Sequence, residues 1–110
     1  MKHFLYRLQP TRPEMLRDGA NEHEAEIIGR HFRHLASLVS AGVVVMAGRT
    51  LNNDETAFGI VVFRAPSDAE ARETMRSDPA VAAGVMRAEL FPYRIALLSA
   101  KGWPENPSDA

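Results

Sequence analysis

Two short apolar runs separated by a polar turn constrain the fold of this chain more than any other feature. The runs are VVVMAG, residues 43–48, and FGIVVF, residues 58–63, and the segment between them carries Asn52, Asn53 and Asp54. Each run has the length of a strand, and Asn and Asp are typical turn residues. The pattern predicts a β-hairpin whose connection is longer than the tightest turns.

Helical patterns flank this hairpin on both sides. Apolar residues recur at helical spacing from residue 22 to about residue 41, between a predicted N-cap at Asn21 and a predicted C-cap at Gly42. After the hairpin, Ser67 with Glu70 three residues later predicts a capping box and a second helix that ends before Pro79. The segment PAVAAGV, residues 79–85, predicts a short helical turn.

Strand patterns occupy both ends of the domain. KHFLYRLQ, residues 2–9, is rich in aromatic and branched residues and stops at Pro10. MRAELFPYRIALLS, residues 86–99, predicts the last strand, which Pro92 bends or places at a sheet edge. Residues 11–21 predict a loop that holds a short helical turn. The order β-α-β-β-α-β predicts an α+β, ferredoxin-like split βαβ fold, with both helices on one face of a four-stranded antiparallel sheet.

This plan leaves the second face of the sheet bare. An antiparallel sheet with one face in water alternates apolar and polar residues, but the two middle runs do not alternate. We therefore expect both faces to be covered, the second by another copy of the same sheet. The predicted partner is thus a second copy of this chain, in a homodimer joined through the open sheet faces.

The length of 110 residues predicts one domain, over residues 1–100, followed by a polar tail at 101–110 with two prolines. The formal net charge of −1 gives no basic excess for binding nucleic acid or an anionic membrane. No apolar run approaches the roughly 20 residues of a membrane span, and the first ten residues are too short and polar for a signal peptide. The absence of cysteine excludes disulfides, thiolate metal sites and cysteine nucleophiles, and fits a cytoplasmic location.

His31 is the first candidate for a functional residue. It follows Ile28 by three residues and precedes Leu35 by four, so it lies on or beside the apolar stripe of its helix. An imidazole that faces a core needs partners for its nitrogens. His31 is therefore either a satisfied core histidine or a residue that lines a site.

Asp78 is the second candidate, because it directly precedes Pro79. Asp as N-cap with Pro as the first helical residue is a common way to begin a helix, and this structural role alone explains the residue. Alternatively, Asp78 accepts an N–H from His31, which holds the tautomer and raises the basicity of the ring for general base catalysis. One carboxylate can serve both roles.

The remaining candidates are ligand-binding residues. Arg7 and Arg94 are charges in apparent strands, and they either form a polar edge or inter-subunit pair, or bind a carboxylate or phenolate in a dimer cleft. His34 lies near His31, but no third ligand accompanies the two, so we expect no metal site. No GxGxxG, P-loop, GxSxG or HExxH motif is present, and we expect no organic cofactor.

Three segments together resemble one known family. They are MKHFLYRL at the N-terminus, HFRHLASLVSAGVVVMAG from His31, and DPAVAAGVM from Asp78. In this combination and order, residues 2–98 resemble the YciI-like family, also called the YCII-related domain. The resemblance implies a ferredoxin-like fold that dimerises into an α/β barrel, with a proposed histidine–aspartate centre in a cleft. His31 and Asp78 match these two residues by position.

The resemblance leaves the substrate open, since most members of the family have no assigned substrate. One branch resembles dehydrochlorinases that act on chlorinated hydroxyquinols. This chain has Arg49 where many relatives have proline, and Arg49 either meets an anionic ligand or is a solvated hairpin residue. The loop at residues 11–21 is longer than in the shortest relatives and could fold over a pocket.

Two functional hypotheses follow. The first is a small cofactor-free enzyme in which His31 is the general acid/base and Asp78 orients it. Such an enzyme would catalyse proton abstraction, elimination or isomerisation on a small cyclic or anionic substrate. The second is a non-catalytic module that binds a small ligand or serves as a structural dimer, because this fold carries both kinds of protein.

Overall fold

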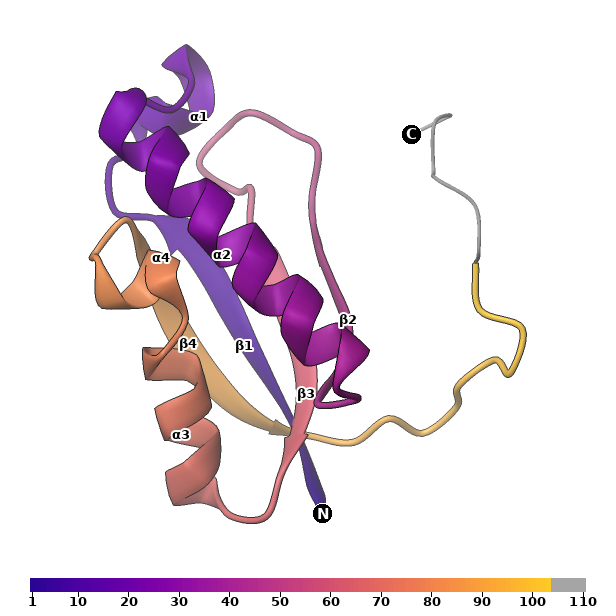
Figure 1. Ribbon diagram of the computed structural model, residues 1–110. Helices are drawn as coiled ribbons and strands as arrows, with labels where there is room; N and C mark the ends of the chain where they lie inside the picture. Colours follow the sequence, from indigo (N-terminus) through magenta and orange to yellow (C-terminus); the bar gives the residue numbers. More distant parts are fainter. Residues whose placement is uncertain (104–110) are drawn as a thin grey trace.

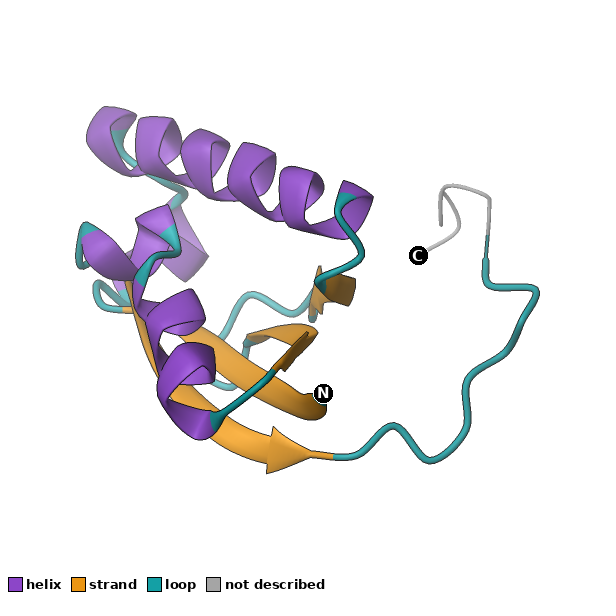
Figure 2. Cartoon of the chain, turned by 60° about the horizontal axis from the view of Figure 1, so that its bottom comes forward, coloured by secondary structure: helices purple, strands orange, loops and turns teal. Residues whose placement is uncertain are grey.

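The chain forms a four-stranded antiparallel sheet that carries α2, α3 and α4 on one face (Figures 1 and 2). The computed structural model describes residues 1–103. The elements are β1 (Lys2–Pro10), α1 (Glu14–Asp18), α2 (Glu22–Ser40), β2 (Val44–Arg49), β3 (Gly59–Ala65), α3 (Asp68–Arg76), α4 (Pro79–Ala82) and β4 (Met86–Tyr93). The strand order β2-β3-β1-β4 and the element order are those of the predicted α+β, ferredoxin-like fold, which is confirmed.

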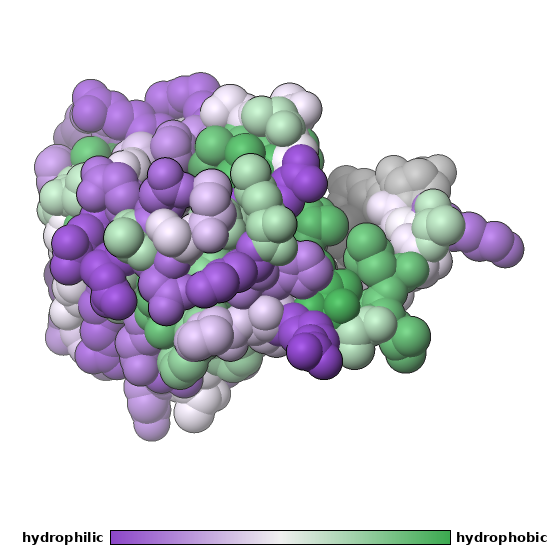
Figure 3. All heavy atoms as spheres, turned by 90° about the horizontal axis from the view of Figure 1, so that it is seen from below, coloured by the Kyte–Doolittle hydropathy of each residue, from purple (hydrophilic) through white to green (hydrophobic). Residues whose placement is uncertain are grey.

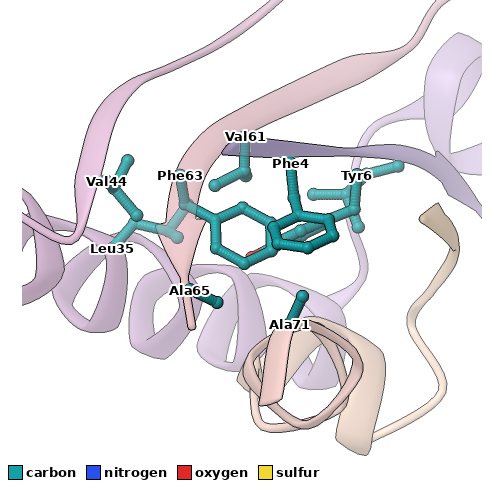
Figure 4. Packing of buried hydrophobic residues seen from close by; sticks show 9 residues of the cluster. Phe4, Tyr6, Leu35, Val44, Val61, Phe63, Ala65 and Ala71 are labelled. Atoms are coloured by element: carbon teal, nitrogen blue, oxygen red, sulfur yellow. The ribbon is translucent and has the colours of Figure 1, made fainter. Parts of the chain in front are cut away.

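The core lies between the sheet and the helices. Along β1, Phe4, Tyr6 and Leu8 are buried on the helix side, as the two-residue period of a strand requires. Figure 4 shows these aromatic side chains with Phe63 of β3, above Leu35 of α2 and Ala71 of α3. The sequence pattern of residues 2–9 therefore places one face of β1 against the helix layer.

Local capping explains where the long helix begins and ends. The Asn21 side chain accepts the Glu24 backbone N–H at 2.8 Å, and the Glu24 carboxylate accepts the Asn21 N–H at 2.9 Å, which completes a capping box. Gly42 follows the helix with a φ of 75°, a conformation that glycine adopts without strain. In α3, Ser67 accepts the Glu70 N–H at 3.2 Å, which is one half of the predicted box.

The loop between β1 and α2 is attached to α2 through a buried carboxylate. Glu24 accepts hydrogen bonds from Arg12 Nε at 2.9 Å and from a terminal guanidinium nitrogen of Arg12 at 2.7 Å. Arg12 also donates to the Gly19 carbonyl at 3.1 Å. The predicted short helical turn in this loop is α1. The contacts of Arg12 with Glu24 and Gly19, which we call the clasp at Glu24, join both ends of the loop to α2.

The last strand is shorter than predicted. It ends at Tyr93, whereas the sequence pattern extends it to Ser99. The only neighbour of β4 is β1, and their pairing ends at His3 with Tyr93. In this register only Met1 and Lys2 remain beyond His3, so β1 offers no backbone to pair with residues 96–99. The predicted edge position of this strand is confirmed. Residues 104–110, which are most of the predicted polar tail at 101–110, lie outside the described residues.

The open face of the sheet carries a row of apolar side chains, one from each strand. The pairing registers align Met46 with Val62, Val62 with Leu5, and Leu5 with Phe91. Met46 is 50% exposed and Phe91 is 42% exposed, and no described helix covers this face (Figure 2). In the described part of the chain, no helix is long and apolar enough to cross a membrane.

The clasp at Glu24 predicts a pH dependence of stability. The Arg12 hydrogen bonds, with the Asn21 N–H, lower the pKa of Glu24 from about 4.5 to about 2. A lowered carboxyl pKa stabilises the fold above the unfolded pKa, and that contribution is lost as the pH falls through the folded pKa. We expect Glu24→Gln to unfold at lower denaturant concentration than wild type near neutral pH, with the difference shrinking between about pH 5 and about pH 2.

Urea unfolding across that pH range measures this difference. Glu26→Gln is the matched control, because Glu26 forms an exposed pair with Arg30 on the same helix. Exposed pairs contribute about 0–1 kcal/mol, so this variant should follow wild type at every pH. A wild-type advantage over Glu24→Gln that is equal at both ends of the pH range would contradict the prediction.

Candidate active site

The candidate site is built around the Asp78 carboxylate. Asp78 is the N-cap of α4, with Pro79 as the first helical residue, and its Oδ1 accepts the Ala80 backbone N–H at 2.9 Å. The predicted structural role of Asp78 is therefore confirmed. Asp78 is fully buried, and a buried carboxylate requires donors for its remaining lone pairs.

Two side chains from distant parts of the sequence supply those donors. The Nδ1 of His31 lies 2.7 Å from Asp78 Oδ1, and the Tyr6 hydroxyl donates to Oδ2 at 2.7 Å. Both distances are typical of hydrogen bonds to an ionised group. The sheet, α2 and α4 therefore meet at one carboxylate.

Each donor is placed by the element that carries it. His31 follows the buried Ile27 by one helical turn and precedes the buried Leu35 by another, so its ring faces α4 rather than solvent. Tyr6 projects from β1 on the helix side, and its ring meets Phe63 edge-on, with centroids 5.6 Å apart. The helical stripe and the strand alternation thus converge on Asp78.

The hydrogen bonds decide the charge of the site. Burial favours the neutral acid and by itself raises the pKa of Asp78. The donors His31 and Tyr6, the positive charge of a protonated His31 and the Ala80 N–H outweigh burial, and the pKa of Asp78 lies below its ordinary value. Burial and the Asp78 charge raise the pKa of Tyr6. Near neutral pH the carboxylate is therefore ionised and the phenol keeps its proton.

An ionised Asp78 determines the tautomer of His31. A carboxylate only accepts hydrogen bonds, so the proton of the neutral ring is on Nδ1 and the lone pair is on Nε2. Within residues 1–103, Nε2 has no hydrogen-bond partner. Arg7 Nε is the single side-chain nitrogen or oxygen of these residues that is both buried and unpartnered, so Nε2 is not buried. The His31 side chain is 17% exposed. Nε2 is therefore reached by solvent and can accept a proton.

The four predicted ligand-binding residues do not join this pair in one site. Arg7 points to the open face, because it follows Tyr6 in a strand. There it pairs with Glu89 of β4 in the same chain. Arg49 donates to the Thr50 carbonyl at 2.9 Å, at the end of β2. His34 lies one turn beyond His31 and is half-buried. Arg94 follows β4.

Two cavities lie away from the histidine–aspartate pair. One, of about 460 Å³, includes Lys2, His3, Tyr93 and Arg94 in its lining. The other, of about 440 Å³, lies beside the start of β2 and is described below. Neither is lined by His31 or Asp78. Residues 1–103 contain no group of three or more His, Cys, Asp or Glu residues that could hold a metal ion.

The sequence pattern alone does not single out Tyr6, whose hydroxyl donates to Asp78 in the structure. The signal was the alternation of β1, which places Tyr6 on the helix side with Phe4 and Leu8. A buried tyrosine hydroxyl usually has a hydrogen-bond partner. An inward tyrosine opposite two helices therefore indicates a polar group in the helix layer.

A family model confirms the resemblance seen in the sequence. The model of the YCII-related domain matches residues 4–94. The chain belongs to the YCII-related domain family. No curated protein matches this chain.

A solved structure has the same fold. It is a 5-chloro-2-hydroxyhydroquinone dehydrochlorinase from Burkholderia phenoliruptrix AC1100, in complex with 2,5-dihydroxybenzoquinone. The TM-score is 0.59 and the sequence identity is 16%, over 83% of this chain and 93% of that chain. At this identity the similarity supports the fold, whereas the chemistry of the present chain has to be argued from its own residues.

The contact between Tyr6 and Asp78 predicts the effect of Tyr6→Phe. The variant removes one donor from the carboxylate and keeps the aromatic ring. The pKa of Asp78 should rise, and the free energy of unfolding near neutral pH should fall by about 1.5–3 kcal/mol, the range for hydrogen bonds to charged groups. The stability that ionised Asp78 provides should then be lost at a higher pH on acidification.

Carbon-detected NMR titration of the aspartate carboxyl groups measures this pKa, and urea unfolding measures the stability. Tyr93→Phe is the matched control, since Tyr93 is 46% exposed and its hydroxyl has no hydrogen-bond partner in residues 1–103. If Asp78 titrates identically in wild type and Tyr6→Phe, the proposed electrostatic role of Tyr6 is wrong.

Proposed function

We propose that this chain is a small enzyme in which His31 is the general acid/base and Asp78 orients it. The observation that carries the proposal is the arrangement of the imidazole: Nδ1 lies on a buried carboxylate, and Nε2 has no hydrogen-bond partner among residues 1–103. An imidazole changes its charge near physiological pH, so it can both accept and return a proton. Asp78 stabilises the imidazolium that forms when Nε2 accepts a proton.

The chemistry that suits this pair is removal of a proton from a small acidic substrate. Nε2 accepts the proton of a ring hydroxyl or an activated C–H bond, and the electron pair left behind moves into the ring system. That pair can expel a leaving group as an anion, which is an elimination, or take a proton at another carbon, which is an isomerisation. None of these steps requires electrons from a cofactor.

The substrate class we propose is a small cyclic compound with acidic hydroxyl groups. Two observations support it: the chain belongs to the YCII-related family, and a similar solved structure is a dehydrochlorinase in complex with a dihydroxybenzoquinone. Hydroxyquinols and their chlorinated forms carry phenolic protons that an imidazole can remove.

We further propose that the working form is a homodimer joined through the open sheet faces. The row of Met46, Val62, Leu5 and Phe91 gives this face an apolar centre. Beside the row, Arg7 Nε is the one buried side-chain nitrogen or oxygen atom of residues 1–103 that has no hydrogen-bond partner. A second copy would cover the apolar row and could supply that acceptor.

One observation favours the alternative of a non-catalytic module. Neither described cavity touches His31 or Asp78, and the contact between them also serves to hold α2 against α4. On this alternative the pair is a satisfied buried polar network, and the family fold provides only a dimer or a ligand site. The two hypotheses differ in what the loss of His31 affects, which is activity in the first and stability alone in the second.

The test of the catalytic proposal is His31→Ala in a turnover screen. The panel contains small hydroxylated rings with and without a halogen, including 5-chloro-2-hydroxyhydroquinone, and is read by absorbance and chloride release. Loss of a general acid/base typically costs about 10²–10⁴-fold in rate, and we expect this loss for any compound that wild type converts. His23→Ala, in the exposed first turn of α2, should retain the wild-type rate.

Circular dichroism distinguishes a catalytic loss from unfolding. His31→Ala should keep the helical signal of the folded chain. A compound that wild type and His31→Ala convert at equal rates would overturn the catalytic role of His31. A panel that wild type leaves unconverted, with a folded but destabilised variant, favours the non-catalytic alternative.

The dimer proposal predicts that a charge in the apolar row prevents association. Phe91→Glu should shift the chain to a monomer in sedimentation equilibrium at micromolar concentration, because the buried carboxylate would have no partner. Phe32→Glu is the matched control, since Phe32 is exposed on α2, on the opposite side of the sheet. Wild type that sediments as a monomer, or Phe91→Glu that associates as tightly as wild type, would refute the open-face dimer.

A further inference from the structure

An apolar arm, residues 94–103, follows the edge strand β4 and leaves the body of the molecule (Figure 1). The start of the arm is anchored, because the Ile95 N–H donates to His3 Nδ1 at 3.2 Å. Beyond Ile95, the arm forms no hydrogen bond to the rest of the described chain. Figure 2 shows from a second side that the arm stands away from both sheet and helices.

The arm exposes large apolar side chains that the chain itself does not bury. Leu97 is 94% exposed, Leu98 is 68% exposed and Trp103 is 96% exposed. Figure 3 shows apolar residues gathered where the arm departs from the body. Contiguous apolar surface of this kind on a water-soluble domain usually marks an interaction site.

The same chain has a groove beside the base of the arm. The cavity of about 440 Å³ lies between the base of the arm and the start of β2, with His3 of β1 and Phe63 and Arg64 of β3 also in its lining, which is mainly apolar. Val43 and Val45 line one side, and Ile95 and Leu98 line the other. β2 is an edge strand, so its outer backbone groups have no strand partner and can receive an extended segment.

We propose that the arm of one copy lies along this groove of a second copy, and that the exchange is reciprocal. Donor and acceptor are both on this chain, which is the condition for a self-complementary two-fold contact. Leu97 and Trp103 become buried on the partner, beside its edge strand β2, while Leu98 stays in the lining of the groove of its own chain. The arm begins where the edge strand β4 ends, at the border of the open sheet face, so this contact would adjoin the interface of the open-face dimer.

The length of the arm fits this role. An extended chain advances about 3.3 Å per residue, so residues 94–103 reach roughly 30 Å. The described chain as a whole, with the arm included, measures 38 × 35 × 24 Å along its principal axes. The arm can therefore cross most of one face of a neighbouring copy, whereas in its own copy it points away from the sheet.

Trp103 provides a direct readout, because it is the only tryptophan of the chain. The experiment dilutes the full wild-type chain and follows the emission maximum of Trp103, with sedimentation equilibrium on the same samples. We expect red emission, typical of an exposed indole, in the dilute monomer. The emission should shift to the blue with the same concentration midpoint as dimer formation.

Leu97→Asp tests the arm without risk to the fold, because Leu97 has little contact with its own chain. Removing one buried leucine should raise the dimer dissociation constant by roughly tenfold or more. Leu51→Asp is the matched control, since Leu51 is 63% exposed in the loop between β2 and β3. This control should associate as wild type does.

The outcomes separate the arm from the sheet interface. If a dimer forms while Trp103 emission stays red, or if Leu97→Asp associates as tightly as wild type, the arm exchange is wrong and the open-face dimer stands. If emission is blue at every concentration, including that of the monomer, the arm folds on its own chain and the proposal is wrong. If wild type does not associate at all, both the arm exchange and the open-face dimer are wrong.

Discussion

The buried carboxylate of Asp78 is the interaction on which this structure depends. It accepts hydrogen bonds from β1 through Tyr6, from α2 through His31 and from α4 through the Ala80 N–H. An ionised carboxylate without donors would be too costly to bury, so these three elements must meet at one place. The packing of helices on the sheet is therefore specified by a polar contact as well as by the apolar core beside it.

The same contact links stability to chemistry. The donors that lower the pKa of Asp78 keep it ionised, and the ionised form holds the proton of His31 on Nδ1. The lone pair of the ring then lies at Nε2, outside the network. The sheet separates this arrangement from the open face, where Arg7 pairs with Glu89 beside the apolar row. One side of the sheet therefore carries the Asp78 network, and the other carries the apolar row and the pair of Arg7 with Glu89.

Local sequence patterns were enough to predict the fold. The features that they did not predict depend on contacts between residues far apart in the sequence. Caps, turn residues and periodicity are properties of neighbouring residues, so the helices and the hairpin could be derived directly from the sequence. The contact between His31 and Asp78 was foreseen because each residue has a fixed direction, one from a helical stripe and one from the following Pro79. The pair of Arg7 with Glu89 depends on the register of β1 against β4, and the role of Tyr6 depends on what lies above the sheet. Neither the register nor the overlying layer can be read from a single strand.

Helix α2 is held at two points by buried acidic groups before any ligand is bound. Near its N-terminus, Glu24 joins it to Arg12 and to the loop at residues 11–21, and in its middle His31 joins it to Asp78. Leu35 then packs the following turn into the apolar core. A helix held at three successive places has little freedom to rotate about its axis, so the direction of the His31 ring is set by the fold itself. Such preorganisation is what a general base requires, because no part of the binding energy of a substrate has to be used to orient it.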